Sequence, residues 1–410
     1  MGMREEVEVI SSVCENKDIH VLFENNVDYM MQSCGDVWDF VKEYYNETRQ
    51  VPPSDLLQTR FRDFDTVQDP APTIYAVNRL KETFLDESLR TTVRKAAQFL
   101  QDNQSGKALN TMSADISSLA RITARVRDLD VTDIEDALQY FEKTRQSAMN
   151  GDIGIRSGIA AFDLCLPMGI AKGQLGVLLA YPAIGKSWMA LFLAVKAWQN
   201  GRVPMILSLE MTEQEVRNRI FTIIGNGKWS HRAISSGRVN NNEFKEWADG
   251  NLVDKPPFKI VSNDGGSEVT PNVVRAKIDQ YKPDIVFIDY LQLMQDNAGT
   301  SSNETVKIKN LSRELKLLAI SEQVPIIAIA SATPDDASDL ESVPQLGQVA
   351  WSRQIAYDAD WVLAFGRKQN TGVLEVAFRK NRHGFLGDFY IDADFDSGKF
   401  EEMMDPADLL

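Results

Sequence analysis

The chain has 410 residues, of which 43% are apolar and 25% are charged, and its formal net charge is -15. This length is greater than one ordinary core needs, so it predicts two or three domains. No apolar run approaches the roughly 18 residues that span a bilayer, which argues against a membrane protein. The acidic charge argues against a protein that wraps nucleic acid around a basic outer surface, although a ring can confine its phosphate contacts to a central channel.

The first ten residues, MGMREEVEVI, carry acidic side chains where a signal peptide carries positive charge, and no apolar stretch of signal-peptide length follows them. We therefore expect a cytoplasmic protein. Cys14, Cys34 and Cys165 are far apart, and together with the three histidines they form no zinc-binding spacing. We expect reduced thiols and no metal other than one carried by a nucleotide.

Residues 1–125 are predicted to form a helical N-terminal domain. Apolar positions recur at helical spacing in residues 36–48 and 75–119, and clusters of prolines separate these stretches. Residues 126–151 are predicted to be a linker with one amphipathic helix, because Ile134, Leu138 and Phe141 share one face of TDIEDALQYFEKTRQSAMNG. Such a face needs a partner surface.

Residues 152–410 show a different pattern, in which short runs rich in Val, Ile and Leu alternate with longer helical segments. Continuous apolar strands joined by helices predict an α/β fold with a mostly parallel sheet that is covered on both faces. Two further strands near residues 373–380 and 388–392 predict an antiparallel extension at the sheet edge. The parallel strands are expected at GVLLA (176–180), VPMIL (203–207), FKIV (258–261), DIVFID (284–289), VPIIAIA (324–330) and WVLAF (361–365).

The segment GVLLAYPAIGKSW contains a buried strand, a turn and the start of a helix, which is the setting of a phosphate-binding P-loop. Backbone N–H groups at the helix start can hold phosphate oxygens, Lys186 can neutralise the β and γ phosphates, and the Ser187 hydroxyl can bind magnesium. Ala180 stands where the motif GxxxxGK[ST] begins with glycine. The residues predicted to bind ATP are Ala183, Ile184, Gly185, Lys186, Ser187 and Trp188.

Two carboxylates follow other predicted strands and complete the expected ATP site. Asp289 ends the run DIVFID and can hold the magnesium ion, while Glu210 follows the strand in ILSLEM and can orient the attacking water. Thr212 and Glu215 form a capping-box pattern after Glu210, which places that residue between a strand and a helix.

These motifs, in this order, resemble the DnaB-type replicative helicases, including their bacteriophage members. The resemblance is carried by AYPAIGKS, LSLEM, IDYLQLM, SRELKLLA followed by VPIIAIA, DAD and KNRHG, and it covers residues 153–395. It implies a RecA-like motor that uses ATP and Mg²⁺, a homohexameric ring, and 5′ to 3′ movement on single-stranded DNA. It also implies a primase and a helicase loader as partners.

By the same resemblance, Glu210 activates water and Asp289 is the Walker B acid, while Lys380 and Arg382 reach the ATP site of the next subunit. Two departures from the family concern DNA binding. Ser331 stands where a glutamine usually links the γ-phosphate to the DNA loops, and the arginine expected before DAD is missing, with Arg353 nearby. We expect DNA contacts between residues 332 and 353, with Ser331 and Arg353 as candidates.

Two alternatives remain open at this point. One is a RecA-type or RadA-like recombination ATPase, which the sequence motifs IDYLQLM and KNRHG disfavour. The other is a nucleotide-bound assembly platform without unwinding activity, which the departure at Ser331 keeps open and the intact ATP-site residues disfavour.

Overall fold

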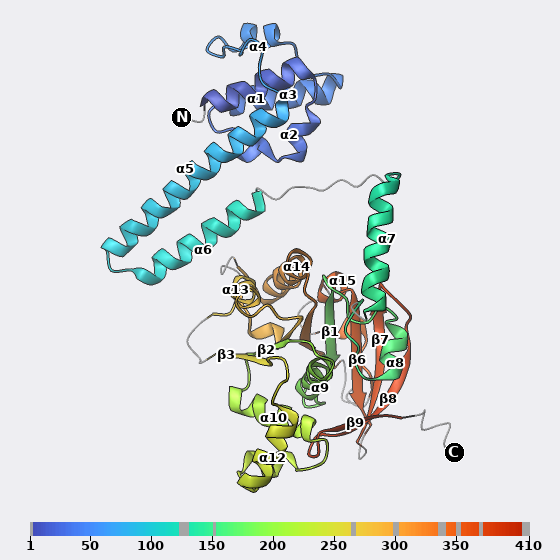
Figure 1. The fold of residues 1–410 in the computed structure, drawn as a ribbon. Helices are drawn as coiled ribbons and strands as arrows, with labels where there is room; N and C mark the ends of the chain where they lie inside the picture. The colour runs from blue at the N-terminus through green and yellow to red at the C-terminus, as the bar shows by residue number, and fades with distance from the viewer. Residues whose placement is uncertain are drawn as a thin grey trace. The chain divides into compact units, whose positions relative to one another are not determined.

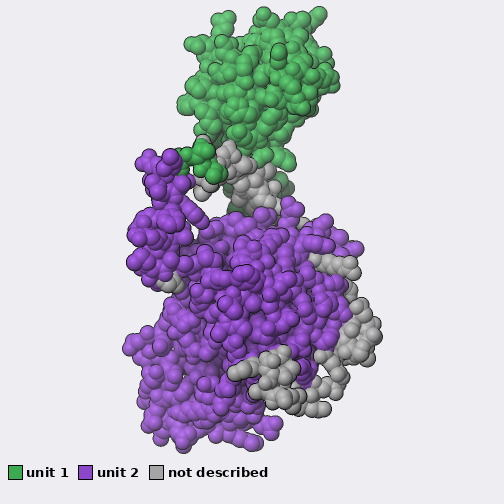
Figure 2. Space-filling model, turned by 90° about the vertical axis from the view of Figure 1, so that its right-hand side faces the viewer, with its two compact units in different colours: residues 1–133 green, residues 134–410 purple. Residues whose placement is uncertain are grey.

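The computed structural model describes residues 3–122, 131–150, 153–263, 268–297, 303–334, 342–349, 354–368 and 372–403. The chain divides into two compact units, residues 1–133 and 134–410, which are coloured separately in Figure 2. Within the described residues, no helix has both the length and the apolar character required to cross a membrane.

The first unit is helical, as the spacing of its apolar residues predicts. Its core surrounds Trp38, whose indole N–H donates a hydrogen bond of 2.8 Å to Asp28. The buried carboxylate of Glu6 accepts hydrogen bonds from the backbone N–H groups of Ser33 and Cys34 at the start of the third helix. Its elements are α1 (Met3–Asn16), α2 (His20–Glu24), η1 (Val27–Tyr29), α3 (Gly35–Thr48), α4 (Ser54–Arg60), α5 (Thr73–Gln101) and α6 (Ser105–Ile122).

The long helices α5 and α6 form a hairpin (Figure 1). Proline residues precede α5, as the sequence predicts, and the chain reverses after it at Asn103, which has a φ of 56°. The Thr92 hydroxyl on α5 donates a hydrogen bond of 2.9 Å to Asp115 on α6. The stretch between residues 75 and 119 is therefore two packed helices.

The second unit is built on a nine-stranded sheet with the order β3-β2-β4-β5-β1-β6-β7-β8-β9. Strands β1 to β6 are parallel, and β7 to β9 continue the sheet in antiparallel fashion. The α/β fold class and the antiparallel edge extension are thus confirmed. The strands are β1 (Leu175–Ala180), β2 (Pro204–Ser208), β3 (Lys259–Ser262), β4 (Ile285–Asp289), β5 (Ile326–Ser331), β6 (Trp361–Arg367), β7 (Val373–Asn381), β8 (Asp388–Asp394) and β9 (Lys399–Met403).

Helices cover both faces of this sheet, and alternate residues of β1 belong to different cores. Leu178 and Ala180 pack in the core that contains α9, whereas Val177 and Leu179 pack in the core that contains α13 and α14. The helices of this unit are α7 (Ile134–Met149), α8 (Ala160–Cys165), α9 (Lys186–Gln199), α10 (Glu213–Gly225), α11 (His231–Ser235), α12 (Asn241–Asn251), α13 (Pro271–Tyr281), α14 (Glu304–Glu322) and α15 (Gln354–Asp358), with 3₁₀ turns η2 (Leu291–Leu293) and η4 (Leu346–Gln348).

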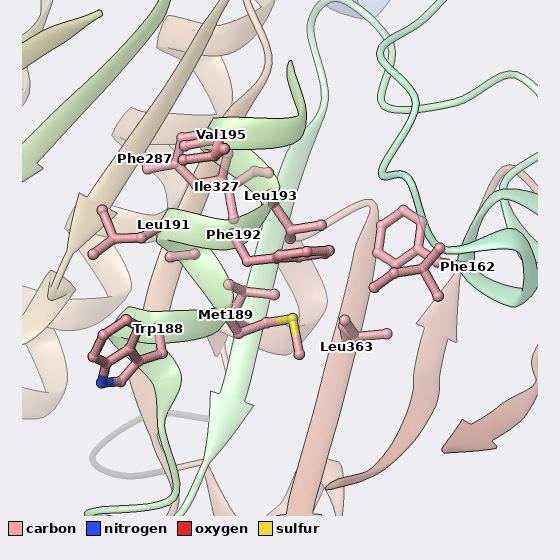
Figure 3. Close-up of a cluster of buried hydrophobic side chains, with 14 of the residues drawn as sticks. Phe162, Trp188, Met189, Leu191, Phe192, Leu193, Val195, Phe287, Ile327 and Leu363 are labelled. Carbon is pink, nitrogen blue, oxygen red and sulfur yellow. The ribbon is translucent and has the colours of Figure 1, made fainter. Parts of the chain in front are cut away.

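Helix α9 lies against the centre of the sheet. Figure 3 shows its side chains packed with Phe287, Ile327 and Leu363, which come from β4, β5 and β6. This packing fixes the start of α9 at the carboxyl edge of the parallel strands, which is the edge where α/β proteins bind ligands.

Candidate ATP site

The loop between β1 and α9 has the backbone that a phosphate cradle requires. Ala183 and Gly185 both adopt positive φ angles, of 63° and 109°, and Gly185 is the N-cap of α9. A Cβ atom on Gly185 would lie 2.2 Å from the ring of Phe395, so only glycine fits at this position. The loop thus directs the first N–H groups of α9 toward the carboxyl edge of the sheet.

A cavity of about 500 Å³ opens at this edge, and it brings together residues from distant parts of the second unit. All the residues for which the sequence predicts catalytic roles within one subunit contribute to it. It is lined by Pro182, Ala183, Gly185, Lys186, Ser187, Trp188, Glu210, Arg219, Asp289, Tyr290, Ser331 and Phe395.

Lys186 begins α9, and its ammonium group lies over the loop. Its Nζ donates hydrogen bonds of 3.1 and 2.9 Å to the backbone carbonyls of Ala180 and Tyr181. Burial lowers the pKa of Lys186, while the carboxylates of Asp289 and Glu210 act in the opposite direction. A half-buried cation at the start of a helix is suited to bind a polyphosphate.

Asp289 is the last residue of β4 and is almost completely buried. Burial raises the pKa of Asp289, and a hydrogen bond from the Ser187 hydroxyl lowers it. A hydroxyl and a carboxylate that line one cavity at the carboxyl edge of a sheet supply the oxygen ligands that Mg²⁺ prefers. The donor set therefore fits a magnesium ion bound together with a nucleotide.

Glu210 lies in the turn between β2 and α10, on the wall of the cavity. The capping box predicted after it is present, because the Thr212 hydroxyl accepts from the Glu215 N–H and the Glu215 carboxylate accepts from the Thr212 N–H. Because this box fixes where α10 begins, it also restricts the conformation of the turn that contains Glu210.

The sequence interpretation missed four residues of this cavity, which are Pro182, Arg219, Tyr290 and Phe395. Arg219 lies on α10, with its guanidinium 5.1 Å from the ring centre of Trp188. Burial lowers the pKa of Arg219, whereas Asp289, Glu215 and Glu210 raise it. Its place one helical turn beyond Glu215 could have indicated that it lies near the cavity. The sequence does not show which face of α10 meets the cavity, because that depends on how the helix packs.

Phe395 follows β8 and stacks on Trp188, with ring centres 5.6 Å apart and planes 6° apart. His231 packs edge-on against the Trp188 indole, at 5.2 Å. Nothing in the local sequence around Phe395 indicates this contact, because it arises where the antiparallel strands return beside the P-loop.

A sequence profile of the DnaB-like helicase C terminal domain matches residues 154–402, which is more than half of the chain. The chain belongs to the DnaB-like helicases. The resemblance seen in the motifs is thereby confirmed, and the matched range includes the P-loop, both strand-end acids and the KNRHG segment.

Two DnaB-like relatives illustrate the extent of the similarity. The probable plasmid replicative DNA helicase of Chlamydia trachomatis is 31% identical over 219 residues, which cover 52% of this chain and 48% of the relative. The replicative DNA helicase DnaC of Bacillus subtilis is 25% identical over 329 residues, which cover 73% of this chain and 68% of the relative. The chain thus spans about half the length of the Chlamydia relative.

Two solved structures agree with the RecA-like fold. One is an isolated ATPase domain, which aligns with a TM-score of 0.58 and 26% identity and covers 67% of this chain and 100% of that domain. The other is a DnaB-like replicative helicase, described with its interactions with primase, which aligns over 98% of this chain and 99% of its own with a TM-score of 0.57. Its identity is 21%, so this second likeness concerns the fold alone.

Lys380 and Arg382 do not line the cavity of their own chain. Both donate hydrogen bonds of 2.8 Å to the backbone carbonyl of Tyr357 near the end of α15. The Nζ of Lys380 also donates to the carbonyls of Ala356 and Ala359, at 2.8 and 2.6 Å. Burial lowers the pKa of Lys380, and the neighbouring Arg382 adds to this effect.

Three other residues that the sequence predicts for ATP or DNA binding lie in different surroundings from one another. The side chain of Ile184 packs against both hydrophobic cores, so any contact of this residue with a phosphate would come from its backbone. Ser331 ends β5 and lines the cavity beside the P-loop. Arg353 lies outside the described residues.

Proposed function

We propose that this protein is a subunit of an ATP-driven replicative DNA helicase. The proposal is carried by one observation, the convergence of Lys186, Ser187, Glu210 and Asp289 on a single cavity. A P-loop cation, a magnesium-binding pair and a separate carboxylate are the parts that hydrolysis of a nucleoside triphosphate needs.

Each residue then has a definite task. Lys186 and the N–H groups of the loop bind the β and γ phosphates, while Ser187 and Asp289 hold Mg²⁺, which neutralises phosphate charge when bound. Glu210 orients the attacking water. Arg219 adds a second cation on the α10 side of the cavity.

We further propose that six copies of this subunit form a ring around single-stranded DNA, with ATP hydrolysis driving 5′ to 3′ movement. Two features support an assembly of this kind. The apolar face of α7 is not buried within the chain, and Lys380 and Arg382 do not line the cavity of their own subunit. We expect primase and a helicase loader to bind this ring, and we expect it to act in the cytoplasm.

DNA binding is assigned to the chain that follows β5, between residues 332 and 353. Its sequence carries four acids and no Lys or Arg before Arg353, so we propose that backbone N–H groups hold most of the DNA phosphates. Residues 342–349 are a described part of this segment and lie against the end of β5, where Ala332 and Val349 form an antiparallel bridge.

The test is an ATPase assay with and without single-stranded DNA, alongside unwinding of duplexes that carry a single-stranded tail of only 5′ or only 3′ polarity. We expect DNA to stimulate hydrolysis and only the 5′-tailed strand to support unwinding. DNA-stimulated hydrolysis without unwinding would instead favour a recombination ATPase. Absence of hydrolysis in the assembled protein would favour an assembly platform.

A further inference from the structure

Residues 342–349 are attached to the end of β5 through Gln348. The backbone carbonyl of Gln348 accepts a hydrogen bond of 2.8 Å from the N–H of Thr333, next to the bridge between Ala332 and Val349. The described end of the proposed DNA-binding segment is therefore bonded to the strand end that borders the ATP cavity.

A second attachment holds the beginning of the same segment. The Arg379 guanidinium on β7 donates hydrogen bonds of 3.2 and 3.3 Å to the carbonyls of Pro344 and Val343. Residues 342–349 are thus bonded both to the strand end beside the ATP cavity and to β7, the strand that carries Lys380.

The side chain of Gln348 reaches the P-loop itself. The hydroxyl of Tyr181, a fully buried residue, donates a hydrogen bond of 2.9 Å to Gln348 Oε1. The backbone carbonyl of Tyr181 accepts a hydrogen bond of 2.9 Å from Lys186 Nζ. One residue thus contacts the phosphate-binding lysine through its main chain and the proposed DNA segment through its side chain.

Nucleotide binding is expected to change the hydrogen bond between Lys186 and the Tyr181 carbonyl. The ammonium group forms stronger, charge-assisted hydrogen bonds with phosphate oxygens than with neutral backbone carbonyls. When Lys186 turns to the phosphates, the carbonyl of Tyr181 loses a charged donor. The position of Tyr181 is then coupled to the presence of nucleotide.

The residue at the end of β5 is poorly suited to make such a link. Ser331 pairs with Ala180 and lines the cavity, but its hydroxyl is attached directly to Cβ and extends little beyond the backbone. We infer that Tyr181 and Gln348 transmit the nucleotide state of the P-loop to the DNA-binding segment, and so act as positioning residues in place of a longer side chain at Ser331. This inference rests on the proposed helicase function.

Tyr181→Phe removes only the hydroxyl. Gln348→Met keeps a similar length but removes the whole side-chain amide, whose oxygen also accepts a hydrogen bond of 2.9 Å from the Gln345 N–H. We expect each variant to lower the stimulation of ATP hydrolysis by single-stranded DNA about three- to tenfold, the range expected for loss of one coupling hydrogen bond. The double variant loses no more than Gln348→Met alone, because that change already breaks the bond to Tyr181.

A second measurement reports coupling without hydrolysis. The affinity for a fluorescent oligo(dT) is measured by anisotropy, with and without a non-hydrolysable ATP analogue. In wild type the analogue strengthens DNA binding. In either single variant we expect this increase in affinity to fall by the same factor as the stimulation of ATP hydrolysis by DNA. Thermal melting of each variant establishes that it is folded.

Gln345→Met is the matched control. Gln345 caps η4 by accepting from the backbone N–H of Gln348, so this change weakens η4 and leaves the bond to Tyr181 in place. The control should retain DNA stimulation. The inference is overturned if the single variants retain full stimulation, if their losses multiply in the double variant, or if Gln345→Met loses as much. Absence of any DNA stimulation in wild type would instead contradict the helicase function itself.

Discussion

Helices α9 and α7 have similar lengths, 14 and 16 residues, but their apolar side chains have opposite surroundings. Ten residues of α9 are buried in its own subunit, whereas α7 has none. Leu138 and Phe141 of α7 are 63% and 66% exposed. An apolar stripe shows that a helix needs a partner, but it does not show whether that partner belongs to the same chain.

The same distinction applies to the chemistry of the two regions. The first turn of α9 supplies Lys186 and Ser187 to the cavity of its own chain, whereas Arg382 contributes nothing to that cavity. We therefore separate groups that act within one subunit from groups that serve a neighbour. The predictions below test this separation, beginning with the largest expected effect.

Lys186→Ala should abolish ATP hydrolysis and unwinding, because it removes the charge that faces the β and γ phosphates. The measurement is phosphate release at saturating ATP with and without DNA. Lys196→Ala is the matched control, since Lys196 is on the same helix and packs over Phe192 outside the cavity. Ordinary DNA-stimulated turnover in Lys186→Ala would refute the P-loop assignment.

Arg382→Ala should bind ATP nearly normally and hydrolyse it about 10³- to 10⁵-fold more slowly, as expected when an arginine finger is lost. Rings assembled from Arg382→Ala and Lys186→Ala subunits decide whether the group acts across the interface. Some interfaces in such rings regain both halves of a working site, so activity should exceed the sum of the separate variants. If mixing restores nothing while wild-type subunits exchange freely, Arg382 acts within its own subunit or only as a cap of the α15 carbonyls.

Glu210→Gln should keep nucleotide and DNA binding and lose about 100- to 10,000-fold in turnover, because only the group that orients water is changed. Single-turnover hydrolysis and a fluorescent nucleotide titration measure the two properties separately. Glu213→Gln, an exposed change on the first turn of α10, is the control. Loss of nucleotide binding in Glu210→Gln would contradict the assigned role.

Changing both Leu138 and Phe141 to Asp should convert hexamers to smaller species in sedimentation experiments. Burial of two apolar side chains at a subunit contact contributes roughly 3–6 kcal/mol. Gln139→Asp with Gln146→Asp adds the same charge on the opposite side of α7 and should leave the ring intact. A hexamer that survives the first pair of changes would show that this stripe does not hold subunits together.

The smallest expected effect gives the most direct comparison of the two helices. Leu193→Ala in α9 should lower the free energy of unfolding by about 2–5 kcal/mol, the cost of a cavity in a packed core. Leu138→Ala in α7 should change the unfolding of the dissociated subunit by no more than about 0.5 kcal/mol. Urea denaturation below the assembly concentration measures both values, and equal losses would mean that α7 packs on its own chain.

Most of the sheet could be predicted from the sequence. Runs such as 284–289 are apolar on both faces, so their own composition indicates a buried parallel strand. Strand β9 gave no such signal, because none of its side chains is buried. Its place in the sheet follows from pairing with β8.

The sequence by itself determined the P-loop, Asp289 and Glu210, because each of them follows from a strand and the turn directly after it. Only the tertiary structure decided that Arg219 and Phe395 belong to the same cavity and that Tyr181 reaches Gln348. These contacts depend on the strand order β3-β2-β4-β5-β1-β6-β7-β8-β9, which places distant segments side by side. Local periodicity reports which face of an element is buried, but the neighbour that covers it is selected by the packing of the whole chain.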